Sequence, residues 1–231
     1  MEIPELPTIL LALIGFLASY LSMQCFTDPN SNTTASSTVQ DRITRFTNPN
    51  FLLVNRIIVL AIGLIHALLI LNPTTPNYLL CPKPSNLNLS LFTWTRHSSI
   101  CLLLILIFAP LRLLAFAQLG KNFTFKLDRP QNLVTSGVYA YVQHPSYTAL
   151  AVVVSAHWML FQRSDGVAGC WMSEAVARSQ WWSLVGWGSV AGALSLVRKR
   201  VVDEERMLKE TFGRQWEDWH RRTKRFVPGV I

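Results

Sequence analysis

Long apolar runs dominate this sequence. Five segments are built mainly from Leu, Ile, Val, Ala and Phe, and they cover residues 7–26, 51–71, 98–119, 148–161 and 180–197. A helix needs about 20 residues to cross the hydrocarbon core of a bilayer. The apolar character continues around each run instead of following one stripe, which separates these runs from the amphipathic helices of a soluble bundle. The sequence therefore predicts an all-α integral membrane protein with about five transmembrane helices.

The composition supports this fold class. Charged residues make up only 15% of the chain, whereas about a quarter of a soluble domain is charged. Eight Trp and twelve Phe argue against a disordered chain, because disordered chains lack large apolar side chains. The net charge is +8, and ten of the 21 Lys and Arg residues lie between residues 198 and 225, directly after the last apolar run. This clustering favours membrane orientation over nucleic-acid binding, and no nucleic-acid partner is expected.

The positions of Lys and Arg predict how the chain is oriented. Cytoplasmic segments of membrane proteins carry the excess of positive charge. If the basic tail after residue 197 is cytoplasmic, five crossings place the N-terminus on the opposite side. The cytoplasmic segments then hold Arg42, Arg45, Lys121, Lys126, Arg129 and the tail, whereas the opposite side holds Lys83, Arg96, Arg163 and Arg178. The sequence therefore predicts a multi-pass protein with a cytoplasmic C-terminus.

Two arginines and two histidines lie inside the apolar runs. Arg56 and Arg112 fall toward the cytoplasmic ends of their runs, so we expect their side chains to extend to the interface, although buried charges in membranes often have functions. His66 and His157 are single histidines, and we interpret them as hydrogen-bonded packing residues rather than ligands.

The four cysteines are far apart in the sequence. They are Cys25, Cys81, Cys101 and Cys170, with no Cys-x-x-Cys pair and no nearby Cys-x-x-His. A structural metal site or a disulfide framework normally shows closer spacing. The sequence therefore predicts neither, and two of the four fall in or beside apolar runs as small hydrophobic residues.

The first candidate functional cluster spans residues 137–148, Gly-Val-Tyr-Ala-Tyr-Val-Gln-His-Pro-Ser-Tyr-Thr. Pro145 suits the first turn of a helix, where its missing N–H costs nothing. His144 then lies just before that turn, beside backbone N–H groups that favour an anion. Three tyrosines surround the same point. An aromatic belt at the membrane interface explains the pattern equally well.

The second cluster spans residues 198–213. Arg200 and Glu204 are four residues apart and so share one face of a continuing helix, where an ordinary exposed ion pair is the simpler interpretation. Glu204 and Glu205 point about 100° apart on a helix, which argues against paired-carboxylate chemistry. Residues 214–225 combine two Trp with basic residues, a pattern suited to lying on an anionic leaflet, so membrane lipids are expected partners.

Common catalytic motifs are missing. The sequence has no GxGxxG, GxxxxGK[ST], GxSxG or HExxH. The sequence therefore gives no motif support for a dinucleotide-binding fold, a P-loop hydrolase, a serine esterase or a zincin.

The two clusters, in this order, resemble the isoprenylcysteine carboxyl methyltransferase family of membrane methyltransferases. The matching residues are Asn132-Leu-Val-Thr-Ser-Gly-Val-Tyr139, His144-Pro-Ser-Tyr147, Arg200, Glu204, Glu205, Leu208, Phe212, Gly213 and the ending Phe226-Val-Pro-Gly-Val-Ile231. The resemblance covers residues 119–231, close to half the chain. Each motif alone is weak, but the ordered combination is specific.

The resemblance implies a multi-pass enzyme of the endoplasmic reticulum membrane. It would transfer a methyl group from S-adenosylmethionine to the C-terminal carboxylate of a prenylated cysteine in CaaX-processed proteins. The first three apolar runs place three N-terminal membrane helices in residues 1–118, and these resemble the family only in kind. Residues 119–231 would form the methyltransferase region, with two further membrane helices and a cytoplasmic C-terminal helix that helps to bind the cofactor.

The resemblance also implies the site residues. Arg200 would bind the substrate, and Arg200 and Glu204 would be the catalytic residues. The implied cofactor contacts are Gln131, Asn132, Leu133, Val134, Tyr139, His144, Pro145, Ser146, Tyr147 and Glu204. No metal is implied. Many family members carry Arg immediately before the His-Pro pair, whereas this chain carries Gln143, so the role of that Arg does not transfer.

Other functions stay open at this point. A phospholipid N-methyltransferase acting on phosphatidylethanolamine is the nearest alternative, but its amine acceptor must lose a proton to a base. Arg200 favours an anionic acceptor, and this residue therefore favours carboxyl methylation over phospholipid N-methylation. A nicotinamide-dependent sterol reductase would bind a dinucleotide instead, and a non-catalytic lipid-binding scaffold would transfer no methyl group.

Overall fold

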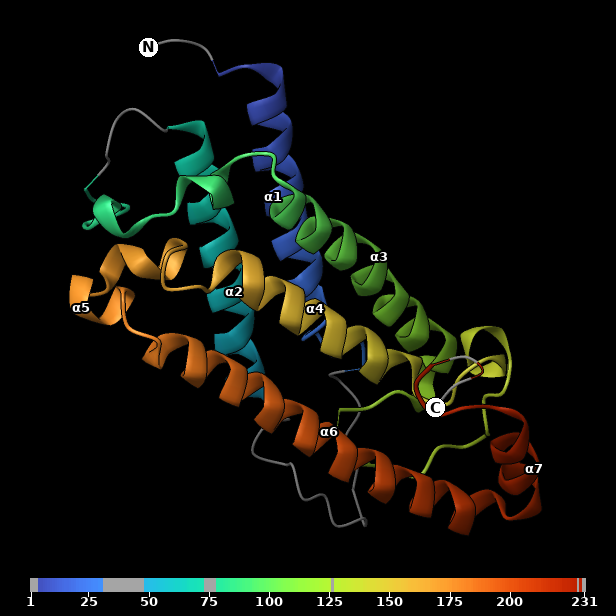
Figure 1. Cartoon of the computed structure of the whole chain (residues 1–231). Coiled ribbons are helices and arrows are strands. Elements are labelled where there is room, and N and C mark those ends of the chain that lie inside the picture. Colours follow the sequence, from blue (N-terminus) through green and yellow to red (C-terminus); the bar gives the residue numbers. More distant parts are fainter. Residues whose placement is uncertain (1–3, 31–47, 73–77, 126, 228, 230–231) are drawn as a thin grey trace.

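The computed structural model describes residues 4–30, 48–72, 78–125, 127–227 and 229. These residues form the helices α1 (Leu6–Gln24), α2 (Pro49–Leu71), α3 (Arg96–Leu119), α4 (Pro145–Phe161), α5 (Glu174–Ala177), α6 (Trp181–Phe212) and α7 (Arg214–Arg222) (Figure 1). Short 3₁₀ turns connect them, and the described residues contain no β-strand beyond one isolated β-bridge. The all-α prediction is confirmed. Arg42, Arg45 and Lys126 lie outside the described residues.

The local sequence determines where several helices begin. Pro49 and Pro145 are the first residues of α2 and α4, where proline costs no hydrogen bond. The Asn48 side chain caps α2 by accepting a hydrogen bond from the Asn50 backbone N–H at 2.9 Å. Thr95 and Ser98 form a reciprocal capping box at the start of α3. These signals are local, so these starts follow from the sequence alone.

Three helices are long and apolar enough to cross a membrane. The candidate spans are Leu6–Gln24, Pro49–Leu71 and Arg96–Asn122, with 19, 23 and 27 residues. Helix α4 is apolar but has only 17 residues. Helix α6 has 32 residues and becomes strongly charged in its second half. Among the described residues, three of the five predicted spans are therefore long and apolar enough to cross a membrane. The fourth and fifth spans stay predictions.

The four apolar helices pack into one bundle, and α6 runs along the outside of α4 (Figure 1). Gly63 of α2 lets α1 approach closely, because a Cβ atom at this position would lie 2.1 Å from Ser19. His66 and His157 are buried in the bundle, with their ring centroids 4.6 Å from Phe92 and 4.7 Å from Phe161, respectively. This geometry supports their interpretation as packing residues. The prediction that they are hydrogen-bonded is not confirmed, because His66 Nδ1 and His157 Nε2 are buried without a hydrogen-bond partner among the described residues.

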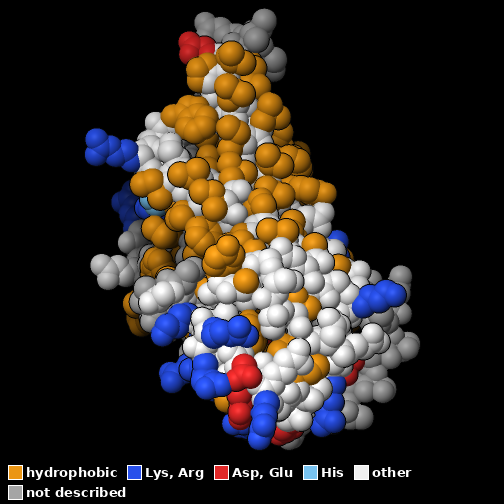
Figure 2. Space-filling model, turned by 90° about the vertical axis from the view of Figure 1, so that its right-hand side faces the viewer, with side chains coloured by type: hydrophobic (Ala, Val, Ile, Leu, Met, Phe, Trp, Pro, Cys, Tyr) orange, Lys and Arg blue, Asp and Glu red, His pale blue; other side chains and the backbone are white. Residues whose placement is uncertain are grey.

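On the face shown in Figure 2, hydrophobic side chains cover much of the helical bundle, and most of the Lys and Arg side chains in view lie at the lower end of the molecule. The exposed apolar residues include Leu13 on α1, Ile57 on α2 and Leu103 on α3. An apolar surface of this extent is unfavourable in water and favourable in lipid. Together with the candidate spans, it marks the chain as a membrane protein.

A disulfide joins Cys81, in the segment between α2 and α3, to Cys170, in the short turn after α4. Backbone hydrogen bonds support it, since the N–H of Lys83 donates to the carbonyl of Cys170 at 3.1 Å. The prediction that the cysteines form no disulfide is therefore wrong. Helices α3 and α4 form an antiparallel pair, so the residues before α3 and after α4 meet although they are 89 positions apart. As predicted, Cys25 and Cys101 are free and buried.

Candidate functional site

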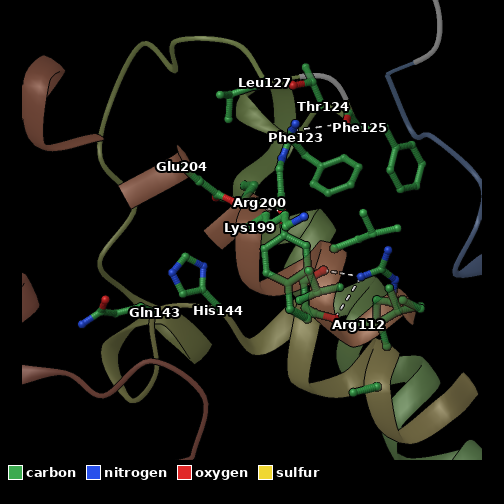
Figure 3. A pocket seen from close by; sticks show the side chains of 18 of the residues that line it. Arg112, Phe123, Thr124, Phe125, Leu127, Gln143, His144, Lys199, Arg200 and Glu204 are labelled. Atoms are coloured by element: carbon green, nitrogen blue, oxygen red, sulfur yellow. Dashed lines mark hydrogen bonds between the residues drawn. The ribbon is translucent and has the colours of Figure 1, made fainter. Parts of the chain in front are cut away.

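A cavity of ≈ 930 Å³ lies between α3, α4, α6 and the segment 122–134. One part of its wall is apolar, with Phe51 from α2, Leu150 and Val154 from α4, and Val190 and Leu194 from α6. Its other part is polar and is lined by Asn132, Ser146 and Tyr147. Arg112, His144, Arg200 and Glu204, which Figure 3 labels, line the same part. The cavity thus joins an apolar channel to a group of ionic and hydrogen-bonding side chains.

Arg200 and Glu204 of α6 both line this cavity. Arg200 is only 6% exposed, and its Nη2 atom donates a hydrogen bond to the carbonyl of Phe125 at 3.2 Å. One helical turn later, Glu204 Oε2 accepts a hydrogen bond from the Tyr147 hydroxyl at 2.9 Å. The simpler interpretation of this pair as an exposed ion pair is therefore wrong, because the shared helix face points into the protein.

The turn before α4 supplies His144, Ser146 and Tyr147. His144 is the residue before the first turn of α4 and is 4% exposed, with its Nε2 atom 3.3 Å from Glu205 Oε1. Upstream, Gly137 adopts a left-handed conformation with φ of 62°, which a side chain would strain and which leaves room for Gln118. Gln118 in turn accepts a hydrogen bond from the Val138 N–H at 2.9 Å.

Tyr139 supports the cavity wall from the same turn. Its hydroxyl donates to the carbonyl of Ala115 on α3 at 3.3 Å, and its own carbonyl accepts from Trp219 Nε1 at 2.9 Å. Burial raises the pKa of the Tyr139 phenol, and the charge of Glu204 adds to the increase. The phenol therefore stays protonated and provides no general base.

Arg112 of α3 is buried at the same end of the cavity. Its Nη1 atom donates to the carbonyl and hydroxyl oxygens of Ser146 at 2.9 and 2.7 Å, and its Nε atom donates to the carbonyl of Cys25 at 3.1 Å. The guanidinium carbon also lies 4.6 Å from the centre of the Phe116 ring. The prediction that Arg112 extends to the interface is therefore wrong, because these partners hold it inside; Arg56 is half-buried.

Most of the predicted cofactor contacts line the cavity. The residues that do so are Asn132, Leu133, Val134, Tyr139, His144, Ser146, Tyr147 and Glu204. Two do not. The Gln131 N–H donates to Oδ1 of the lining residue Asn122 at 3.0 Å, and Pro145 is the first residue of α4. These two residues therefore shape the segments that carry the lining residues.

Glu205 and Arg225 form an ion pair that the sequence interpretation missed. Both Nε and Nη2 of Arg225 lie 2.7 Å from the Glu205 carboxylate oxygens. Burial alone would raise the pKa of Glu205, but hydrogen bonds from His144 and Arg225 outweigh it and lower the pKa to about 2. Glu205 is therefore ionised at physiological pH. Twenty residues separate the partners, so no helix periodicity indicates their contact.

The indoles of α7 also differ from the prediction. Trp216 and Trp219 are buried in a cluster with Ala115 and Tyr139. Their rings therefore pack against the protein, and contact of the basic residues of this stretch with an anionic leaflet stays a prediction. Gly213, with φ of 50°, makes the bend between α6 and α7 that permits this packing.

The polar end can bind an anion beside a cation. Arg112 and Arg200 provide positive charge, and Glu204 provides a carboxylate within the same cavity. The described residues include no group of three or more His, Cys, Asp or Glu that could hold a metal ion. The fold and the cavity therefore define a helical membrane protein with an apolar cavity that ends in a mixed-charge polar site.

Comparison with known proteins shows what the second half of the chain is similar to. Residues 99–210 match the model of the isoprenylcysteine carboxyl methyltransferase family, so this region is similar to that family. The sequence resemblance is thus confirmed.

Three curated relatives agree with the family match. Protein-S-isoprenylcysteine O-methyltransferase B of Arabidopsis thaliana is 31% identical over 124 residues, which cover 52% of this chain and 53% of the relative. The protein-S-isoprenylcysteine O-methyltransferases of Dictyostelium discoideum and Schizosaccharomyces pombe are 26% and 29% identical over 123 and 122 residues. These alignments cover 52% and 51% of this chain and 44% of each relative, so the chain spans about half the length of the curated relatives it matches.

Proposed function

We propose that this chain methylates the C-terminal carboxylate of prenylated cysteine in CaaX-processed proteins, with S-adenosylmethionine as the methyl donor. The observation that carries the proposal is the single cavity of ≈ 930 Å³, in which apolar walls lead to Arg200 and Glu204. A prenylated cysteine has the same two parts, an apolar chain and a carboxylate. The names of the three relatives support the same activity.

Arg200 positions the acceptor in this proposal. A C-terminal carboxylate is ionised at neutral pH and needs no general base, so the protein must orient it and partly remove its water. The buried guanidinium of Arg200 supplies a charge-assisted hydrogen bond for that purpose. A grip on both carboxylate oxygens would reduce nucleophilicity, so we expect one oxygen to be held and the other to attack. The apolar wall from Leu150 to Val154 and from Val190 to Leu194 would hold the prenyl chain.

The polar lining fits the methyl donor. S-adenosylmethionine supplies an electrophilic methyl group when it is bound. Its amino group is cationic and matches the Glu204 carboxylate, and its own carboxylate matches the N-terminal end of α4 near Ser146. Leu133 and Val134 provide an apolar surface beside Asn132 for the adenine ring of the donor. The cavity lining therefore contains a partner for the amino group and a partner for the carboxylate of the ligand.

We further propose five crossings, with α4 and α6 as the last two, a cytoplasmic C-terminus and residence in the endoplasmic reticulum membrane. Residues 1–118 would then form the membrane anchor and residues 119–231 the methyltransferase region. The basic tail supports this orientation. The Cys81–Cys170 bond supports it independently, because disulfides persist in the lumen and are rare in the cytosol.

A methyl-transfer assay tests the activity. Membranes containing the full chain and methyl-labelled S-adenosylmethionine are offered N-acetyl-S-farnesylcysteine in one sample and phosphatidylethanolamine in another. We expect base-labile label on the farnesylcysteine, as for a carboxyl ester. Label confined to the phospholipid would overturn the proposal in favour of N-methylation, and label on neither acceptor with folded protein would exclude both activities.

A further inference from the structure

Residues 223–227 lie across the turn that carries His144, and we call them the C-terminal strap. The Gln143 and His144 N–H groups donate to the carbonyls of Lys224 and Arg225 at 2.8 and 2.9 Å. The Thr148 hydroxyl donates to the carbonyl of Phe226 at 3.0 Å. The strap follows the region that matches the family, which ends at residue 210.

Gln143 fastens the turn to the strap with its side chain. It is buried, and its Nε2 atom donates to the carbonyl and hydroxyl oxygens of Thr223 at 2.8 and 3.1 Å. Its Oε1 atom lies 2.9 Å from His220 Nδ1 and accepts a hydrogen bond from it. The amide points away from Arg200 and Glu204 (Figure 3). An arginine has no acceptor for His220, so the glutamine here matches this particular C-terminal segment.

Arg225 reaches His144 through one carboxylate. Its two nitrogen atoms hold both oxygens of Glu205 at 2.7 Å, and Glu205 Oε1 lies 3.3 Å from His144 Nε2. The Glu205 side chain is 10% exposed and that of Arg225 is 49% exposed. A bidentate pair fixes the plane of the carboxylate as well as its position. The strap thereby fixes the position of the Glu205 carboxylate, which is the hydrogen-bond partner of the His144 ring.

This contact also determines which nitrogen of His144 carries the proton. An ionised carboxylate only accepts hydrogen bonds, so the nitrogen that faces it, Nε2, must donate. In the neutral ring Nδ1 then has a free lone pair. Among the described residues, Glu205 is the polar side-chain partner of the ring, and His144 lines the cavity. Nδ1 is therefore available to accept a hydrogen bond from a ligand.

We propose that the C-terminal strap is a positioning element of the active site, in which Arg225 acts through Glu205 to orient His144 as a hydrogen-bond acceptor toward the methyl donor. Arg225 touches neither cofactor nor substrate in this scheme. The inference rests on the proposed function for the identity of the ligand only. The contacts that form the strap are independent of it.

Ligand affinity provides the first test. The full chain in lipid nanodiscs is titrated calorimetrically with S-adenosylhomocysteine, the product form of the donor. We expect Arg225→Gln to weaken binding by about tenfold, the loss typical of one charge-assisted contact. The matched control Arg222→Gln removes the same charge from an exposed residue whose Nε atom bonds only the Asp218 carbonyl, and should leave binding unchanged.

A double-mutant cycle separates positioning from general damage. If Arg225 acts through His144, then Arg225→Gln should weaken binding much less in a His144→Ala background than in the wild type. In turnover assays, Arg225→Gln should raise the KM for the donor more than it lowers kcat. An equal loss in both backgrounds, or no loss in the wild type, would overturn the proposal.

A spectroscopic measurement keeps this proposal separate from the proposed function. Nitrogen NMR of ¹⁵N-histidine-labelled protein, with His144→Asn used for assignment, reports which ring nitrogen is protonated. We expect the Nε2–H form in the wild type and a mixture in Arg225→Gln. If the wild type binds no S-adenosylhomocysteine, the proposed function fails while this spectrum still decides the role of the strap. The Nδ1–H form in the wild type would refute it.

Discussion

Glu204 is the carboxylate at the polar end of the cavity, and Tyr147 holds it at 2.9 Å. We predict that Glu204→Gln raises the KM for S-adenosylmethionine by about tenfold, because the amide keeps the hydrogen bond but loses the charge opposite the amino group. Glu210→Gln, an exposed carboxylate on the same helix, is the control and should behave as the wild type. Steady-state kinetics at varied donor concentration measure the effect. An unchanged KM for Glu204→Gln would remove Glu204 from the cofactor site.

Glu205 makes stability depend on pH in a defined window. Its pKa falls from 4.5 to about 2 in the folded chain, where hydrogen bonds from His144 and Arg225 outweigh the opposing effect of burial. A depressed folded-state pKa stabilises the fold above the ordinary pKa, and this contribution is lost as the pH falls from 4.5 toward about 2. We predict that the melting temperature falls more steeply over this window in the wild type than in Glu205→Gln. Parallel curves would contradict the prediction.

At the scale of elements, Gly186 of α6 lets this helix approach Trp158 of α4 closely. A Cβ atom on Gly186 would lie 1.6 Å from the Trp158 ring, which itself stacks on Trp182. We predict that Gly186→Ala lowers stability by about 1–3 kcal/mol, as overpacking does, and lowers turnover because α6 carries Arg200.

Gly188 is the matched control for this helix contact. Nothing lies within 4 Å of a Cβ atom at Gly188, and alanine favours a helix over glycine by about 1 kcal/mol. Gly188→Ala should therefore keep its activity, with a melting temperature that is equal to or slightly higher than that of the wild type. Equal effects of the two substitutions would show that α6 does not pack on α4 through Gly186.

At the scale of the whole molecule, the disulfide ties the segment before α3 to the segment after α4. We predict that Cys81→Ser with Cys170→Ser lowers stability by about 2–5 kcal/mol while the methyl-donor site stays intact. In sealed microsomes a membrane-impermeant reductant added outside should leave the bond unbroken, because the bond faces the lumen in the proposed orientation. Reduction without permeabilisation would reverse that orientation.

The sequence predicts those features that depend on local patterns. The apolar runs predict the helices, Pro145 predicts the start of α4, and the ordered clusters indicate Arg200 and Glu204. Contacts made by packing leave no such pattern. Cys81 meets Cys170 only because α3 and α4 are antiparallel, and Arg225 meets Glu205 only because the strap folds back.

Arg112 shows why a sequence position can mislead. Its place near the end of an apolar run suggests an interfacial side chain, whereas Ser146 and Cys25 supply buried acceptors from other helices and segments. The available signal was the presence of a charge within an apolar run, which is costly unless it is paired.

The central claim is that Arg200 holds a prenylcysteine carboxylate for methylation. The most direct measurement is the rate of base-labile methyl transfer to N-acetyl-S-farnesylcysteine by the purified full chain in nanodiscs, for the wild type, Arg200→Ala and the exposed control Arg198→Ala. We predict ester formation by the wild type and Arg198→Ala, and a rate about a hundredfold lower for folded Arg200→Ala. No ester from folded wild type, or an undiminished rate for Arg200→Ala, would contradict the account.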